Sequence, residues 1–382
     1  MAAPKIALVA GEMSGDLLGA ALVTALRARL PAAHFYGVAG PRMQAAGVEP
    51  IASIEQLSVM GIAEVLPALP RILRLRRALI RRLSADRPDV LIGIDAPDFN
   101  LGVERRLRER GIRTVHVVSP TVWAWRAGRV KTIARAVERI LCLFPFEPAF
   151  YAARGVSADY IGHPLADQLD ASVTTAQARA GLGLPAGGPV IAVLPGSRGS
   201  ELKYLAEPFA RAARLIAAQV PGVRFVTPLA KPALRAPMEA AIAAHAAGLA
   251  WTLLDGQSRE AMQAADAVLI ASGTATLECL LLGRPMVVSY RGSPLTAWLL
   301  LKAGLLKTRY VSLPNLLADE APVPELLQDD ATPERLAAAV IELLAPGGAR
   351  ARQLAAFDRV RATLCCDAAA RAAEVVAGLL GA

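Results

Sequence analysis

Short apolar runs alternate with longer stretches of helical periodicity along most of the chain. In the first half, the apolar runs that predict buried strands are residues 6–10, 35–38, 90–94, 114–118, 140–144 and 159–161. The clearest helical periodicity between them covers 16–30, 69–85 and 101–110. Such alternation is typical of α/β domains built on a parallel sheet.

The pattern then starts again. Periodicity is weaker over residues 168–188, and the second series of predicted strands is 190–194, 224–227, 251–254, 267–270 and 286–289. Because 382 residues are too many for one compact core, we expect an α/β protein with two Rossmann-like, doubly wound domains facing a cleft. The predicted domains are residues 1–167 and 168–345, followed by a helical tail, 346–382, that either packs back on the first domain or is swapped in a dimer.

Composition narrows the class of protein. With 54% hydrophobic and 20% charged residues the chain is not disordered. Its four cysteines lack CxxC spacing and its four histidines lack an HExxH motif, so we expect reduced thiols, no metal site and no cofactor. The N-terminal apolar run is too short for a secretory signal, and no apolar run can span a bilayer, which predicts a cytoplasmic protein. The net charge of +9 favours an acidic partner, either nucleic acid, an anionic membrane or a phosphorylated substrate.

The first predicted strand ends in Gly11-Glu12-Met13-Ser14-Gly15-Asp16 and leads directly into a helix. In doubly wound folds, ligands bind beyond the carboxyl ends of the strands. Glu12, Asp16 and the hydroxyl of Ser14 suit a sugar acceptor with free hydroxyls. The alternative is a turn whose helix is capped by Ser14 or Asp16.

Asp95 follows the apolar run 90–94 in the sequence Gly-Ile-Asp-Ala-Pro-Asp-Phe-Asn. A carboxylate at a strand end, beside apolar walls, can accept the proton of an attacking hydroxyl. We therefore expect Asp95 to be the catalytic base and Asp98 to support it. The alternative is that either aspartate only caps the helix that starts near Asn100.

Another strand end carries Trp123-Ala124-Trp125-Arg126, in a chain with only four tryptophans. Aromatic faces stack on sugar rings or acyl chains, and an arginine pairs with phosphate. Trp123 and Arg126 are therefore candidate acceptor-binding residues. Packing of this loop on the core is the alternative.

In the second domain, Leu194-Pro195-Gly196-Ser197-Arg198-Gly199 joins a strand to a helix. A GxxxxGK[ST] motif is absent, so ATP hydrolysis has no support. Small residues beside one arginine suit a diphosphate, which predicts Gly196, Ser197 and Arg198 as UDP-binding residues. A purely structural turn is the alternative.

Residues 271–278 read Ala-Ser-Gly-Thr-Ala-Thr-Leu-Glu, where a strand ends and a helix opens. Helix N–H groups and hydroxyls can hold phosphate oxygens. The predicted UDP ligands here are Ser272, Gly273, Thr274 and Thr276. Glu278 can accept the ribose hydroxyls, although a capping box would account for part of the same spacing.

Residues 69–83 contain six arginines and no acid. On a helical projection Leu69, Ile72, Leu73, Leu75, Leu79, Ile80 and Leu83 share one face, most arginines lie opposite, and Arg76 falls within the apolar face. The predicted membrane-binding residues are Leu69, Ile72, Leu73, Leu79, Arg74, Arg77 and Arg81. The alternative is an ordinary surface helix packed on the sheet. We expect no nucleic acid partner, because no helix-turn-helix, RRM or KH signature occurs.

Eight segments occur in one order: GEMSGD, VAGPRMQAAG, VMGIAEVL, GIDAPDFN, SPTVWAWR, LPGSRGSE, ASGTATLE and VSLPNLLA. Together they resemble the lipid-A-disaccharide synthase family, from about residue 5 to 330 and more loosely to the C-terminus. The resemblance implies a GT-B fold and an inverting, metal-independent transfer. The donor would be UDP-2,3-diacylglucosamine, and the acceptor 2,3-diacylglucosamine 1-phosphate (lipid X). The product would be a β(1→6)-linked lipid A disaccharide phosphate, with release of UDP.

The resemblance also implies residue roles and partners. Asp95 matches an essential aspartate of the family and Arg198 an important arginine, and Asn315 of VSLPNLLA joins the predicted UDP-binding residues. The family implies a homodimer with exchanged C-terminal segments, peripheral on the cytoplasmic face of the inner membrane.

Two other functions compete with this interpretation. A UDP-sugar 2-epimerase can share the two-domain scaffold, but it needs neither an acceptor site nor an apolar, arginine-rich helix. A basic surface-binding protein without enzymatic activity leaves the carboxylates and hydroxyls at the strand ends unexplained.

Overall fold

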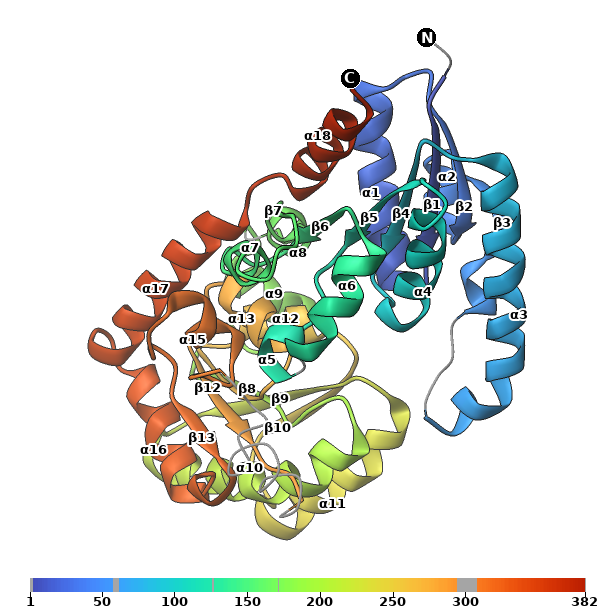
Figure 1. Ribbon diagram of the computed structural model, residues 1–382. Helices are drawn as coiled ribbons and strands as arrows, with labels where there is room; N and C mark the ends of the chain where they lie inside the picture. The colour runs from blue at the N-terminus through green and yellow to red at the C-terminus, as the bar shows by residue number, and fades with distance from the viewer. Residues whose placement is uncertain (1–2, 58–61, 126, 171, 294–307, 382) are drawn as a thin grey trace. The chain divides into compact units, whose positions relative to one another are not determined.

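The computed structural model describes residues 3–57, 62–125, 127–170, 172–293 and 308–381. The chain forms two compact units, residues 1–167 with 363–382, and residues 168–362. Each unit is a parallel sheet with helices on both faces (Figure 1). The predicted class, two Rossmann-like domains with a helical C-terminal segment, is confirmed. Among the described helices, none combines the length and the apolar character that a membrane span requires.

The sheet of the first unit has the strand order β3-β2-β1-β4-β5-β6-β7. Its strands are β1 (Lys5–Ala10), β2 (His34–Ala39), β3 (Glu49–Ser53), β4 (Val90–Ile94), β5 (Arg113–Val117), β6 (Arg139–Cys142) and β7 (Ala158–Tyr160). All neighbouring pairs are parallel. The apolar pattern did not predict β3, because this edge strand is exposed or half-buried along its whole length.

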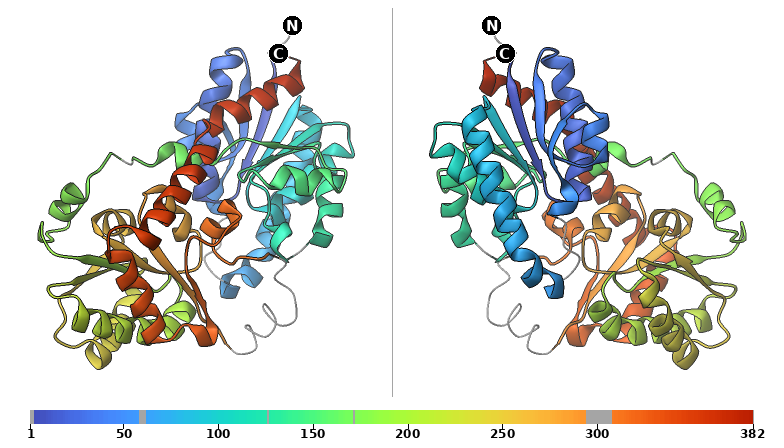
Figure 2. Two further views of the ribbon diagram at one scale, coloured as in Figure 1. Left: turned by 90° about the vertical axis from the view of Figure 1, so that its left-hand side faces the viewer. Right: turned by 90° about the vertical axis from the view of Figure 1, so that its right-hand side faces the viewer.

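Helices cover both faces of this sheet. α1 (Met13–Arg29) contacts α2 (Pro41–Ala45) and α18 (Ala368–Leu380), and Figure 2 shows α18 along the same side as α1. On the other side α3 (Ile62–Asp86) contacts α4 (Pro97–Arg108), which contacts α6 (Val130–Ala136). The short helices α5 (Val122–Trp125), α7 (Glu147–Ala152) and α8 (Pro164–Gln168) follow β5, β6 and β7.

A carboxylate attaches the C-terminal segment to the first unit. The side chain of Asp167 accepts hydrogen bonds from the N–H groups of Cys366 (3.1 Å), Asp367 (3.0 Å) and Ala368 (2.7 Å). These N–H groups lie at the start of α18, where an anion is favoured by the unpaired donors and the helix dipole. Asp167 therefore joins the end of one chain segment of the unit to the beginning of the other.

The second unit has the strand order β10-β9-β8-β11-β12-β13. Its strands are β8 (Val190–Leu194), β9 (Arg224–Leu229), β10 (Trp251–Asp255), β11 (Ala267–Ala271), β12 (Met286–Tyr290) and β13 (Glu325–Leu327), of which the pattern missed only β13. α10 (Gly199–Gln219) contacts α11 (Arg235–His245) and α16 (Pro333–Leu344). The other α-helices that the described residues of this unit form are α9 (Thr175–Gly181), α12 (Ser258–Ala264), α13 (Ala275–Leu281), α15 (Leu313–Ala318) and α17 (Gly348–Leu364).

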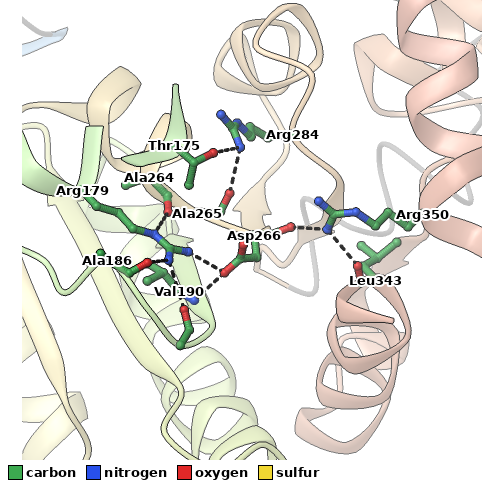
Figure 3. A network of polar contacts seen from close by, with 11 residues as sticks. Thr175, Arg179, Ala186, Val190, Ala264, Ala265, Asp266, Arg284, Leu343 and Arg350 are labelled. Atoms are coloured by element: carbon green, nitrogen blue, oxygen red, sulfur yellow. Dashed lines mark hydrogen bonds and ion pairs between the residues drawn. The ribbon is translucent and has the colours of Figure 1, made fainter. Parts of the chain in front are cut away.

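Arginines stabilise the amino end of β11 (Figure 3). Asp266 accepts hydrogen bonds from Arg179 Nη2 (2.7 Å) and Val190 N (2.8 Å), and its carbonyl oxygen accepts one from Arg350 Nη1 (2.7 Å). Arg284 Nη1 donates to Thr175 Oγ1 at 2.8 Å, and burial lowers the pKa of this guanidinium. Because their guanidinium groups donate hydrogen bonds to the protein itself, these arginines have a structural role. They lie at the end of the sheet opposite the polar loops.

Candidate functional site

In the first unit, the loops that follow β1 and β4 approach each other closely. A Cβ atom on Gly11 would lie 2.4 Å from Cβ of Ala96, so only glycine fits at this position. The buried amide of Asn100, at the start of α4, donates toward the carbonyl oxygens of Val9 (3.1 Å) and Asp95 (2.8 Å). One side chain therefore holds both strand ends in place.

Asp95 lies in a strained segment. Asp95 and Ala96 have φ angles of 52° and 43°, and Val118, after the neighbouring strand β5, has φ of 77°. Positive φ costs non-glycine residues on the order of 1–3 kcal/mol each, and such strain gathers at functional sites. The half-exposed carboxylate of Asp95 makes no hydrogen bond or ion pair with any described residue, which leaves it free to accept a proton from a ligand.

Neither aspartate of this loop caps α4. The helix begins at Pro97, and its N-cap residue, Ala96, has no side chain that could cap it. Asp98 is exposed and forms an ion pair with Arg129. Of the two aspartates that follow β4, Asp95 is therefore the one whose carboxylate has no partner among the described residues.

The three polar residues of the first loop have different surroundings. Glu12 and Ser14 are exposed at the start of α1, and neither side chain bonds another described residue. Asp16 is buried, and its carboxylate accepts hydrogen bonds from the N–H groups of Gly40 (2.9 Å), Arg42 (2.9 Å) and Met43 (3.1 Å). The prediction that Asp16 binds the acceptor is wrong, because its carboxylate has no exposure and is used to cap α2.

Trp123 belongs to a cluster of half-buried aromatic side chains around the buried carboxylate of Glu147, after β5 and β6. Its Nε1–H donates to Glu147 Oε1 at 2.9 Å, and Phe144 N donates to Glu147 Oε2 at 2.9 Å. The indole also packs edge-on against Phe144 and Phe146. Trp123 is therefore half-buried, and its indole N–H is used by Glu147. Arg126 lies outside the described residues.

Burial raises the pKa of Glu147 from 4.5 to about 7, against the hydrogen bonds from Phe144, Ser119 and Trp123 that lower it. Between these two pH values the folded protein holds a proton that the unfolded chain has lost. We therefore expect Glu147 to reduce the free energy of unfolding as pH rises through this window, by on the order of 1–3 kcal/mol. Glu147→Gln should remove this loss, which chemical denaturation of both proteins across this pH range will measure.

The nearby His163 has the opposite effect. Burial lowers its pKa from 6.5 to about 4, so it adds stability as pH rises between those values. The quantity to compare is therefore the difference between wild type and Glu147→Gln at each pH, in which the His163 contribution cancels. An equal slope in both proteins would contradict a proton on Glu147.

In the second unit, two of the predicted loops lie around one pocket of about 320 Å³ at the carboxyl ends of its strands. It is lined by Gly196, Ser197, Arg198, Ser272, Gly273 and Thr274, together with residues after β9 and β10 such as Ala230 and Gly256. Ligands of doubly wound domains bind at this edge of the sheet. The volume is at the lower end of the range for small-molecule sites.

Glu201 arranges the first of these loops. Its Oε2 accepts hydrogen bonds from the N–H groups of Ser197 (2.8 Å) and Arg198 (3.2 Å). These two N–H groups are thus occupied by the carboxylate of Glu201. The Arg198 guanidinium is 76% exposed and meets Glu201 at 3.1 Å. Because exposed ion pairs contribute little, a phosphate can replace this contact.

Three predicted UDP-binding residues lie outside the pocket lining. Thr276 is buried and donates to Gly273 O at 2.7 Å. Asn315 is buried, donates to Val323 O (2.9 Å) and Glu325 Oε1 (2.8 Å), and accepts from Val323 N (3.0 Å). The predictions for Thr276 and Asn315 are therefore corrected, because their polar atoms are used to fold their own loops.

Glu278 differs from these two residues. It is half-buried, lies 3.9 Å from Arg259, and burial raises the pKa of its carboxyl while Arg259 opposes the shift. Its carboxylate makes no capping hydrogen bond at the start of α13, so the capping alternative does not hold. The sequence alone did not reveal the structural roles of Asn100, Glu201 and Glu147. Asn100 and Glu201 belong to the motifs GIDAPDFN and LPGSRGSE, whereas no sequence pattern marks Glu147.

Helix α3 does not present one uniform apolar face. Leu79 (1% exposed) and Leu83 (0%) are in the core of the first unit, and Ile72 and Ile80 pack against that core. Leu69, in contrast, is 43% exposed. The prediction that Leu79 binds a membrane is wrong, because its side chain has no accessible surface to contribute. Arg74, Arg77 and Arg81 are exposed, as that prediction required.

Comparison with protein families identifies a match to almost the whole chain. A family model described as lipid-A-disaccharide synthetase matches residues 6–376. Lipid-A-disaccharide synthase of Pseudomonas aeruginosa strain UCBPP-PA14 is 53% identical over 376 residues, which are 98% of each chain.

Two solved structures illustrate the shared fold. UDP-GlcNAc 2-epimerase from Neisseria meningitidis, bound to UDP-GlcNAc, covers 98% of this chain and 99% of its own with a TM-score of 0.64 at 13% identity. The glycotransferase of kitacinnamycin has a TM-score of 0.60 at 20% identity, with coverages of 98% and 99%. At these identities the similarity establishes the fold and nothing further.

Proposed function

Because the chain belongs to the lipid-A-disaccharide synthetase family, it is a glycosyltransferase, and we propose that it condenses UDP-2,3-diacylglucosamine with lipid X. The observation that carries this proposal is the unpaired, strained Asp95 at the end of β4 in the first unit, together with the arginine-bearing pocket in the second. The first supplies a base for an attacking hydroxyl and the second an anion site for the leaving group.

We assign UDP to the pocket in the second unit. Arg198 would bind the diphosphate, and Ser272, Gly273 and Thr274 would contact it from the opposite loop. Glu278, one turn into α13, would accept the ribose hydroxyls after leaving its weak contact with Arg259. In this arrangement, Arg198 offsets the negative charge that grows on the diphosphate as the glycosidic bond to UDP breaks.

We assign the acceptor to the first unit. The 6-hydroxyl of lipid X would attack the anomeric carbon from the face opposite UDP, and Asp95 would take its proton. The exposed Glu12 and Ser14 would orient acceptor hydroxyls beside it. Attack opposite the leaving group inverts the anomeric configuration, so the product is β-linked.

Acylated substrates partition into membranes, which supports a peripheral membrane location for the enzyme. We propose that the outer part of α3, with the exposed Leu69, the half-buried Leu73 and the exposed arginines Arg74, Arg77 and Arg81, attaches it to an anionic bilayer. We also propose a homodimer that exchanges its C-terminal segment. The contacts that Asp167 makes with the start of α18 would then be made between two copies.

One assay tests transfer against epimerisation. Purified protein is incubated with UDP-2,3-diacylglucosamine in the presence and absence of lipid X, and UDP and disaccharide are measured. We expect UDP release only with lipid X and in equal amount to the disaccharide. UDP release without an acceptor would favour an epimerase-like or hydrolytic site, and the absence of both products would contradict either enzyme.

A further inference from the structure

Four arginines surround one hollow between α3 and α4 in the first unit. Arg76 and Arg77 come from α3 and Arg105 and Arg106 from α4, and with Ile80 and Gly102 they line a volume of about 280 Å³. We call this the arginine hollow. It was not predicted from the sequence, because its two pairs of arginines are almost thirty residues apart and meet only through helix packing.

The charge in the arginine hollow is hardly compensated. Arg76 and Arg77 make no hydrogen bond or ion pair with other residues of the described chain. Arg105 and Arg106 share a single carboxylate, Glu109, at 3.8 and 4.0 Å. Like charges this close repel one another, and an anion among them would remove that cost.

The arginines of the second unit provide a contrast. Arg179, Arg284 and Arg350 donate to carbonyl oxygens, a hydroxyl or Asp266, as Figure 3 shows. Their charge and hydrogen-bond capacity serve the fold. Arg76 and Arg77 donate no such hydrogen bonds to the described residues, so their guanidinium N–H groups remain available to a ligand in the arginine hollow.

Arg76 is also placed by a specific glycine. It falls within the apolar face of α3 and is half-buried over α4. A Cβ on Gly102 would lie 3.1 Å from Arg76 Nη1, closer than most real Cβ contacts. Glycine inside a helix costs about 0.5–1 kcal/mol relative to alanine. Helix α4 thus carries a destabilising residue at the point where the Arg76 guanidinium lies.

The geometry points to a phosphate group as the ligand, because guanidinium groups form paired hydrogen bonds to phosphate oxygens. The neighbouring residues of α3 indicate its source. Leu73 lies one turn before Arg76, and Leu69, one turn earlier still, is 43% exposed. We propose that the arginine hollow binds the phosphate of an anionic phospholipid. The proposal rests on the membrane attachment inferred above and adds a defined lipid site to it.

The test compares two double variants of the full-length protein with equal change of charge. Arg76→Gln/Arg105→Gln alters the arginine hollow, whereas Arg110→Gln/Arg113→Gln alters two exposed arginines of the same unit outside it. Binding is measured to vesicles of phosphatidylcholine alone and to vesicles that also contain phosphatidylglycerol. We expect the first variant to lose roughly thirty-fold in affinity for the anionic vesicles, and the second less than three-fold.

Three controls make the result decisive. Equal losses in both variants would show diffuse attraction and overturn the lipid site. If wild type but not Arg76→Gln/Arg105→Gln binds inorganic phosphate in calorimetry, while the two proteins bind anionic vesicles with equal affinity, the site takes soluble phosphate and the lipid assignment is overturned. UDP release from detergent-dispersed substrates should be unchanged in Arg76→Gln/Arg105→Gln; a loss there would assign these arginines to catalysis and overturn the proposal.

Discussion

Asp95→Asn is expected to lower kcat by about two to four orders of magnitude while UDP still binds. An amide keeps the size and the shape of the side chain, but it cannot accept the proton of an attacking hydroxyl, and general-base catalysis contributes about this much. The carboxylate has no partner among the described residues, so its replacement leaves no buried group unsatisfied. The measurements are UDP release with both substrates present and UDP affinity by calorimetry.

Asp98→Asn is the matched control for this change. It removes the same charge three residues along the same loop, from an exposed side chain paired with Arg129, and should alter kcat less than three-fold. Arg198→Ala should differ from Asp95→Asn by reducing UDP affinity, about ten-fold or more, through loss of a charge-assisted contact. It should also lower kcat, because the charge that grows on the leaving diphosphate loses its partner. Near-normal turnover of Asp95→Asn would remove Asp95 as the base.

The features that sequence reasoning predicted best are those that depend on local pattern. Buried central strands such as 90–94 and 190–194 are continuous apolar runs, and the structure ends them at the predicted residues. The edge strand β3 was missed because its residues are largely exposed, so neither continuous nor alternating hydrophobicity marks it. Strand ends carry the polar loops, which is why the loops at Gly196 and Ser272 could be assigned to one edge before any contact was known.

What could not be predicted is the direction in which each polar side chain points. Glu12 and Asp16 occupy one short motif, yet one is exposed and the other is buried against the start of α2, some twenty-five residues later in the chain. Asn315 and Thr276 likewise serve backbone groups of their own loops. A buried polar group must find partners. Which partners it finds depends on tertiary contacts, and these cannot be predicted from the spacing of residues in the sequence.

Leu79→Ser is expected to lower the free energy of unfolding by about 2–5 kcal/mol. Leu79 is 1% exposed within the first core, so truncation leaves a cavity and places a hydroxyl in apolar surroundings. Leu69→Ser, on the same helix but 43% exposed, should change that free energy by less than about 0.5 kcal/mol. Chemical denaturation of the two variants beside wild type measures both effects.

Vesicle binding should be weakened more by Leu69→Ser than by Leu79→Ser, which is the reverse of their effects on stability. A leucine side chain buried in a bilayer surface contributes roughly 1.5–3 kcal/mol, so Leu69→Ser should weaken partition to vesicles about ten-fold or more. Leu79→Ser, where it remains folded, should bind vesicles as wild type does, because its side chain already lies in the protein core. A destabilised Leu69→Ser with unchanged partition would assign the exposed part of α3 to protein packing. Loss of vesicle binding in a stably folded Leu79→Ser would mean that α3 detaches from the sheet at the membrane.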